Sequence, residues 1–264
     1  KWFQLDPSYF KKIQRFIRKK EGLSLGEILH LRLLGPAAST PVEKEAGAED
    51  DALQVEVELS GQLAQMVEQL GNLTQIPVPE VASSFRGALR PYQQMGTAWM
   101  LFLRRFGLGC CLADDMGLGK TIQWIAYLLK VKEEENPVLP ALLICPTSVL
   151  GNWQKELARF APELKVRLHY GPQRPRGADF LPSIQGAGVV LTSYNLSHID
   201  EAELSMVDWD CICLDEAQNI KNAYTKQAAA IRRLKGRHRI AMTGTPMENR
   251  LTELWSIYDF INPG

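Results

Sequence analysis

Short runs of apolar residues alternate with amphipathic stretches from residue 85 to the end of the chain. Six such runs lie at 110–113, 141–145, 166–170, 188–192, 211–214 and 238–242. An uninterrupted apolar run of this length fits a strand buried on both faces, as in parallel sheets covered by helices. The alternation therefore predicts an α/β domain with a mostly parallel central sheet, whose ligand binds beyond the carboxyl ends of the strands.

The first 84 residues follow a different pattern. Apolar residues recur at three- and four-residue spacing, which predicts short helices at 9–17, 24–34 and 59–71. Stretches rich in proline, glycine and acidic residues separate and follow these helices and are typical of linkers. We therefore expect a small helical segment with linkers over 1–84 and a separate lobe over 85–264.

The composition is typical of a globular protein. The 264 residues are 45% hydrophobic and carry 30 basic and 30 acidic side chains, which excludes the collagen-like and disordered classes. Because the net charge is zero, the case for nucleic-acid binding has to come from local sites. Cys211 and Cys213 would project to one face of a strand, so we expect buried free thiols rather than a metal site.

The sequence contains no membrane or secretion signal. No stretch approaches the ~20 continuous apolar residues of a membrane-spanning helix, and no secretory leader opens the chain. The chain begins without Met and stops just after an apolar segment. We therefore expect an excised piece of a longer protein, and we expect no membrane partner.

A glycine-rich loop follows the first apolar run of the lobe. Gly117, Gly119, Lys120 and Thr121 lie in this loop, and an amphipathic helix follows it directly. In such loops the backbone N–H groups surround an anion, the lysine reaches the β- and γ-phosphates, and the hydroxyl binds Mg²⁺. Asp114 occupies the place of the usual first glycine. We predict that the nucleotide contacts are Asp115, Met116, Gly117, Leu118, Gly119, Lys120 and Thr121.

Two adjacent carboxylates, Asp215 and Glu216, end the apolar run at 211–214. Enzymes with such a phosphate loop use the first acid to hold Mg²⁺ and the second to polarise the attacking water. Adjacent carboxylates at a buried strand end are costly unless a cation or a proton neutralises them. We therefore predict that Lys120, Asp215 and Glu216 are catalytic and that Thr121 and Asp215 are the metal ligands.

Five ordered motifs carry a resemblance to a known family. They are LRPYQ at 89–93, ADDMGLGKT at 113–121, CPTS at 145–148, LDEAQ at 214–218 and TGTP at 243–246. Together they resemble the SWI/SNF-type ATPases of helicase superfamily two, in the version found in the bacterial and archaeal branch. The resemblance covers about 85–264, which corresponds to the first of two RecA-like lobes. Residues 1–84 more weakly resemble the helical region that precedes the motor.

The resemblance implies roles for further residues. Gln93 matches the glutamine that reads the adenine edge, because an amide can donate and accept at once. Thr243, Gly244 and Thr245 match the motif that couples the nucleotide site to DNA. Hydroxyls and backbone N–H groups bind phosphate oxygens without reading bases. Two loops at strand ends supply the expected DNA contacts, which are Pro146, Thr147, Ser148, Thr192 and Ser193.

The family implies an ATP-dependent translocase on double-stranded DNA that remodels protein–DNA complexes and uses Mg²⁺ with ATP. It also implies a second RecA-like lobe in the same polypeptide, which this sequence lacks, and a cytoplasmic, nucleoid-associated place in a prokaryote. An arginine of the second lobe reaches the γ-phosphate in such enzymes. We therefore expect this lobe alone to bind nucleotide weakly and to hydrolyse it slowly or not at all.

Three alternatives stay open at this point. A strand-separating DNA helicase or an RNA helicase has similar motifs, a scaffold could use the lobe only to bind DNA or protein, and a metabolite kinase also has a phosphate loop. For Trp153, which opens a predicted helix, both core packing and a surface role remain open. The arginines without a matching finger motif are Arg232, Arg233, Arg237, Arg239 and Arg250.

Overall fold

The computed structural model describes residues 76–245 and 251–263. The chain divides into two compact units, Lys1–Gln75 and Ile76–Gly264, so every described residue belongs to the second. The helices predicted at 9–17, 24–34 and 59–71 lie outside the described residues. The second unit begins before residue 85, because Ala82 is buried and the backbone N–H and hydroxyl of Ser83 both bond Glu133.

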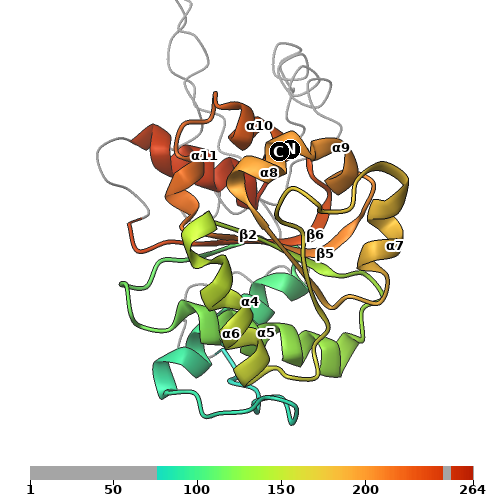
Figure 1. Ribbon diagram of the computed structural model, residues 1–264. Coiled ribbons are helices and arrows are strands. Elements are labelled where there is room, and N and C mark those ends of the chain that lie inside the picture. The colour runs from blue at the N-terminus through green and yellow to red at the C-terminus, as the bar shows by residue number, and fades with distance from the viewer. Residues whose placement is uncertain (1–75, 246–250, 264) are drawn as a thin grey trace, which may run out of the picture. The chain divides into compact units, whose positions relative to one another are not determined.

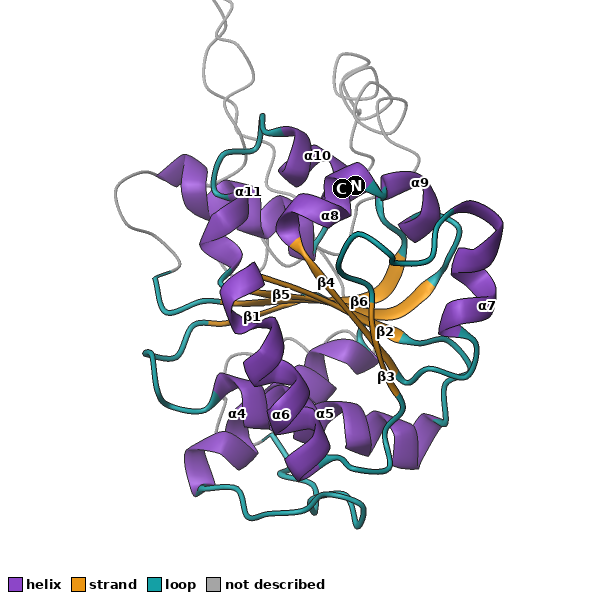
Figure 2. Cartoon of the chain, viewed as in Figure 1, coloured by secondary structure: helices purple, strands orange, loops and turns teal. Residues whose placement is uncertain are grey.

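A single parallel sheet of six strands forms the centre of the described unit, in the order β1-β6-β5-β2-β4-β3 (Figure 2). The strands are β1 (Cys110–Leu112), β2 (Ala141–Cys145), β3 (Val166–Leu168), β4 (Val189–Ser193), β5 (Trp209–Asp215) and β6 (Gly236–Met242). Each strand overlaps one of the six apolar runs. Every residue of β2 and β4 is buried, because helices cover both faces of the sheet. The predicted α/β class is confirmed.

Helices pack on the two faces of the sheet (Figure 1). One face carries α4 (Pro91–Arg105), α5 (Lys120–Glu135) and α6 (Leu150–Phe160), and the other carries α8 (Tyr194–Ile199), α10 (Lys226–Arg233) and α11 (Leu251–Ile261). The shorter helices are α7 (Phe180–Ile184), α9 (Glu201–Leu204), η3 (Thr147–Val149), η4 (Gly177–Asp179) and η5 (Ala217–Ile220). This three-layer arrangement is the one expected for a RecA-like lobe.

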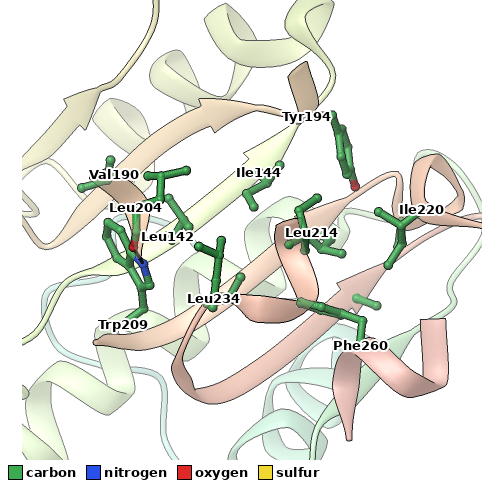
Figure 3. Close-up of a cluster of buried hydrophobic side chains, with 14 of the residues drawn as sticks. Leu142, Ile144, Val190, Tyr194, Leu204, Trp209, Leu214, Ile220, Leu234 and Phe260 are labelled. Carbon is green, nitrogen blue, oxygen red and sulfur yellow. Dashed lines mark hydrogen bonds between the residues drawn. The ribbon is translucent and has the colours of Figure 1, made fainter. Parts of the chain in front are cut away.

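Alternating side chains of β5 build the core on both sides of the sheet. Ile212 and Leu214 join an apolar cluster with residues of α8, α10 and α11, and this cluster includes Trp209 (Figure 3). From 211 to 214 successive residues face opposite sides of the sheet, so Cys211 and Cys213 face the layer of α4, α5 and α6. Trp209 does not follow this alternation, since it lies in the same cluster as Ile212. All five cysteines are free, and all but Cys111 are buried. The prediction of buried free thiols is therefore confirmed for Cys211 and Cys213.

A buried ion pair ties this helical layer to the sheet. The guanidinium of Arg104 in α4 donates to Asp210 Oδ1 in β5 at 2.7 Å and to Glu135 Oε1 in α5 at 2.8 Å. The side chains of Arg104 and Asp210 are 2% and 5% exposed. Removing one partner of such a pair would leave an uncompensated buried charge, at a cost of about 3–5 kcal/mol.

The same network continues to His238 of β6. Arg104 Nη1 donates to the hydroxyl oxygen of Tyr127 at 3.2 Å, and that hydroxyl lies 2.7 Å from His238 Nδ1. His238 Nε2 lies 3.0 Å from the carbonyl oxygen of Leu108. A carbonyl only accepts, so Nε2 carries the proton and Nδ1 accepts from Tyr127. The ring is therefore held in its neutral form.

Lowering the pH below ~6.5 is expected to destabilise this unit through His238. Burial, with the charge of Arg104 as a second cause, lowers the pKa of His238 to about 3, whereas the unfolded value is about 6.5. In this window the unfolded chain binds a proton that the native state does not. The free energy of unfolding therefore decreases as the pH is lowered through this window. The contribution of His238 is at most about 1.4 kcal/mol per pH unit.

Urea unfolding between about pH 8 and pH 5 measures this effect. The His238→Gln variant lacks the titrating ring, so its stability should vary less with pH over the same range. An equal slope in the two proteins would contradict the prediction.

Candidate functional site

The predicted site residues gather at the carboxyl edge of the sheet. Leu112 at the end of β1 pairs with Met242 of β6, and Met242 pairs with Asp215 at the end of β5. Because neighbouring strands lie about 4.8 Å apart, the ends of β1 and β5 are about 10 Å apart. The glycine-rich loop that follows β1 and the acid pair, Asp215 and Glu216, therefore lie side by side at this edge, with only the end of β6 between them.

The glycines of the loop are required by its backbone. Gly117 and Gly119 adopt left-handed conformations, with φ of 83° and 79°, which other residues rarely adopt. A Cβ atom on Gly119 would also lie 2.6 Å from Gln93 Nε2. Gly119 is the N-cap of α5, so the tight turn points the first N–H groups of this helix toward the loop, as phosphate binding requires.

Lys120 is the first residue of α5, and its side chain folds back over the glycine-rich loop. Its ammonium donates to the carbonyl oxygens of Asp114 at 2.7 Å and Asp115 at 3.1 Å, and the residue is 9% exposed. Burial raises the pKa of Asp215, and the positive charge of Lys120 acts against that rise. The lysine therefore lies near enough to the carboxylate for their charges to interact, while its hydrogen bonds within the described residues go to carbonyl oxygens.

Both carboxylate oxygens of Asp215 accept hydrogen bonds. Oδ1 accepts from the backbone N–H of Glu216 at 3.0 Å, and Oδ2 accepts from the indole N–H of Trp153 at 2.7 Å. Burial raises the pKa of Asp215 above its usual value, and the indole and the Glu216 N–H act in the opposite direction. Trp153 is 1% exposed, so it is a core residue, but its polar contact with the acid pair was not predicted.

Glu216 has a strained backbone. Its φ of 53° lies in the left-handed region, which among the described residues other than glycine is shared only with Asn136. The Glu216 carbonyl accepts from the side-chain amide of Asn219 at 2.8 Å and from the Tyr194 hydroxyl at 3.3 Å. Such strain costs about 1–3 kcal/mol and occurs preferentially at functional sites. These contacts hold the acid pair in a conformation that it would not adopt alone.

A chain of hydrogen bonds connects Glu216 to the end of β6. The side-chain amide of Gln218 donates to Glu216 Oε2 at 2.7 Å, and its oxygen accepts from the Thr243 hydroxyl at 2.7 Å. The backbone N–H of Thr245 donates to Thr243 Oγ1 at 3.0 Å. We assigned no role to Gln218 from the sequence, although its place in the LDEAQ motif was a signal. The acid pair and the TGTP motif are thus directly linked.

Two further predicted residues contact the loop. The side-chain amide of Gln93 donates to the carbonyl oxygen of Leu118 at 3.1 Å and accepts from the Arg90 N–H at 2.9 Å. A Cβ atom on Gly244 would lie 3.1 Å from Met116 Cγ, so the TGTP motif packs against the loop. The structure therefore brings the predicted nucleotide, catalytic and coupling residues together.

The residues predicted to contact DNA divide into two groups. Thr147 and Ser148, in η3 after β2, are exposed. Thr192 and Ser193 are buried, and their hydroxyls are used within the protein. The Thr192 hydroxyl donates to the His169 carbonyl at 3.1 Å, and the Ser193 hydroxyl caps α8. In this structure Thr192 and Ser193 do not reach the surface, which narrows the predicted contacts to the loop after β2.

Thr121 and Asp215 supply oxygen atoms of the kind that Mg²⁺ prefers. Thr121 lies in the first turn of α5, directly after the loop. Asp215 lies at the carboxyl edge of the sheet, where that loop also begins. Among residues 76–245 and 251–263 no group of three or more His, Cys, Asp or Glu could hold a metal ion. Mg²⁺ usually takes one or two protein oxygens and completes its shell with phosphates and water, so the oxygens of Thr121 and Asp215 suit it.

Comparison with known proteins places the chain in context. Residues 92–264 match the family model of the SNF2-related domain. Over its whole length the chain is 54% identical to the Bacillus subtilis protein YwqA, whose name presents it as a candidate ATP-dependent helicase/translocase. It is 36% identical, over 84% of its length, to the TATA-binding protein-associated factor mot1 of Schizosaccharomyces pombe. The chain spans 29% of the first protein and 12% of the second.

A solved structure resembles this chain in both sequence and fold. The Sulfolobus solfataricus SWI2/SNF2 ATPase core in complex with dsDNA is 44% identical, with a TM-score of 0.64. The match covers 71% of this chain and 38% of that one.

In the part of the chain that the structure describes, no helix has the length and apolar character to cross a membrane.

Replacing Gly119 with alanine is expected to disrupt the nucleotide site. The new Cβ would enforce a left-handed alanine, at about 1–2 kcal/mol, and would collide with Gln93. Calorimetric titration with ATP and Mg²⁺ should show at least tenfold weaker binding. Gly151→Ala in α6 is the matched control, because a Cβ there meets nothing within 4 Å and alanine favours helix by up to about 1 kcal/mol. Equal binding by the two variants would refute the assignment of the loop.

Proposed function

The chain belongs to the family of SNF2-related domains, and we propose that it contains the first of two RecA-like lobes of an ATP-driven motor on double-stranded DNA. One observation carries the proposal. The phosphate loop that leads into Lys120 and Thr121 lies at the same sheet edge as the carboxylate of Asp215, because β1, β6 and β5 end in register there.

Binding of ATP would exchange the partners of Lys120. Its ammonium would leave the carbonyl oxygens of Asp114 and Asp115 for the β- and γ-phosphates, which carry full charges and bind it more strongly. Thr121 and Asp215 would hold Mg²⁺, which neutralises phosphate charge in this type of reaction. Gln93 would contact the adenine, since its amide already lies against the loop.

Glu216 would orient the water that attacks the γ-phosphate. Its Oε2 is fixed by the amide of Gln218, and the other carboxylate oxygen is available for the water. When the γ-phosphate leaves, the chain Glu216–Gln218–Thr243 can exchange hydrogen-bond partners. That exchange would pass the nucleotide state to the TGTP motif, as in switches that respond to a γ-phosphate.

The DNA contacts are proposed at the loop that follows β2. Pro146, Thr147 and Ser148 lie at the carboxyl edge of the sheet, and the two hydroxyl side chains are exposed. Hydroxyls and N–H groups bind phosphate oxygens without reading bases, which suits movement along DNA. The archaeal relative whose structure contains dsDNA supports this partner. We further propose that the motor displaces DNA-bound proteins in the cytoplasm of a prokaryote.

The arginines of the described unit support a need for the second lobe. Arg232 pairs with Asp259, Arg233 with Glu201 and Arg237 with Glu135, while Arg239 donates to backbone carbonyls. Arg250 lies outside the described residues. An arginine finger contributes roughly 10³–10⁵ in rate to related enzymes. We therefore propose that this lobe alone binds ATP weakly and hydrolyses it slowly or not at all.

Glu216→Gln is expected to separate ATP binding from hydrolysis in the two-lobed protein that contains this chain. The amide keeps the size of the side chain and still accepts from Gln218, but it lacks the charge that polarises water. Hydrolysis with double-stranded DNA should fall at least 100-fold, with ATP affinity within about threefold of wild type. Wild-type protein with and without duplex DNA, and with RNA, is the reference.

The outcomes of this experiment distinguish the alternatives. A wild-type rate that duplex DNA does not raise would contradict the motor. Stimulation by RNA, or separation of the DNA strands, would instead favour a helicase.

Thr243→Val is expected to uncouple hydrolysis from DNA. Valine keeps the shape but removes the hydroxyl that donates to Gln218, so the factor by which duplex DNA raises the rate should fall at least fivefold. Thr243→Ser keeps the hydroxyl and should retain most of the stimulation. The measurement is ATP hydrolysis with and without DNA in both variants, and the idea fails if valine and serine behave alike.

A further inference from the structure

The side chain of Trp153 reaches the acid pair from a neighbouring helix. It lies in α6, which follows β2, and β2 is paired with β5, the strand that ends in Asp215. The indole nitrogen lies 2.7 Å from Asp215 Oδ2, at the short end of the usual range for N–H···O hydrogen bonds. Because the indole is 1% exposed, little water competes for this contact.

Together with the backbone, the indole fixes both oxygens of the carboxylate. Glu216 N–H holds Oδ1 and Trp153 holds Oδ2, so Asp215 cannot rotate without breaking a hydrogen bond. Each oxygen keeps capacity for a further partner. We propose that Trp153 is a positioning residue, which holds the Asp215 carboxylate in the orientation that binds the Mg²⁺ of Mg·ATP. This inference rests on the proposed role of Asp215 as metal ligand.

A second tryptophan in the same layer shows that packing alone does not require this hydrogen bond. Trp124 of α5 is fully buried and meets Trp153 edge to face, with ring centroids 5.4 Å apart. Within the part of the chain that the structure describes, the indole N–H of Trp124 meets no acceptor other than the weak sulfur of Cys211. Both rings fill the core, but only that of Trp153 is directed at a carboxylate.

The two tryptophans provide a matched pair of substitutions. Trp153→Phe keeps an aromatic ring but removes the donor to Asp215, and Trp124→Phe removes a similar volume without touching the acid pair. Loss of a hydrogen-bond partner behind a metal ligand typically weakens metal affinity 10–100-fold. The effect should therefore be specific to Mg²⁺ and absent from the part of ATP binding that occurs without metal.

The test measures ATP binding to the chain by calorimetry over a series of Mg²⁺ concentrations and in excess chelator. In Trp153→Phe the Mg²⁺ concentration that gives half of the metal-dependent gain in affinity should rise about tenfold or more. Its affinity for ATP in chelator should match that of Trp124→Phe, and both variants should unfold cooperatively in urea. Equal Mg²⁺ dependence in the two variants would overturn the inference.

A control separates this inference from the proposed function. If Mg²⁺ has no effect on ATP binding by the wild-type chain, the nucleotide assignment fails before Trp153 is tested. If Trp153→Phe does not fold, NMR spectra of the indole N–H groups in the wild-type chain test the inference instead. The Trp153 signal should shift when Mg²⁺ is added to the ATP complex and the Trp124 signal should not, whereas an unmoved Trp153 signal would overturn the inference.

Discussion

The register of three parallel strands is the constraint on which the whole site depends. Leu112, Met242 and Asp215 are paired across the ends of β1, β6 and β5. The phosphate loop, the TGTP motif and the acid pair are therefore adjacent at one edge of the sheet. Because the side-chain period of a strand is two, a shift of one residue would turn Asp215 to the opposite face of the sheet. Pairing of β5 with β2 on one side and β6 on the other fixes this register, and Ile212 and Leu214 anchor the strand in the apolar cluster.

Charge placed at this edge makes the site receptive to an anion. Burial opposes the charged form of Asp215, and the lysine ammonium rests against carbonyl oxygens that carry only partial charges. A magnesium–triphosphate group would satisfy both, since its anionic oxygens suit the lysine and its metal suits the carboxylate. The fixed partners of the acid pair, which are Trp153, Tyr194 and Gln218, preorganise the site so that less rearrangement is needed on binding.

Local sequence predicted the parts of this structure that depend on local chemistry. The six strands could be read from apolar runs because both sheet faces are covered, and the loop could be read because Gly117 and Gly119 need left-handed backbone. The indole of Trp153 could not be placed, because its contact with Asp215 joins residues 62 positions apart. The hydroxyls of Thr192 and Ser193 looked like those of Thr147 and Ser148. Only the structure shows that the Thr192 hydroxyl bonds the His169 carbonyl and that the Ser193 hydroxyl caps α8.

The position of the Lys120 ammonium in a nucleotide complex tests the central claim most directly. A crystal structure of the chain with Mg²⁺ and a non-hydrolysable ATP analogue would measure it. We predict that the ammonium has moved from the carbonyl oxygens of Asp114 and Asp115 to the phosphates, and that a metal lies between Thr121 and Asp215. A nucleotide bound elsewhere, with Lys120 still on those carbonyls, would contradict the account.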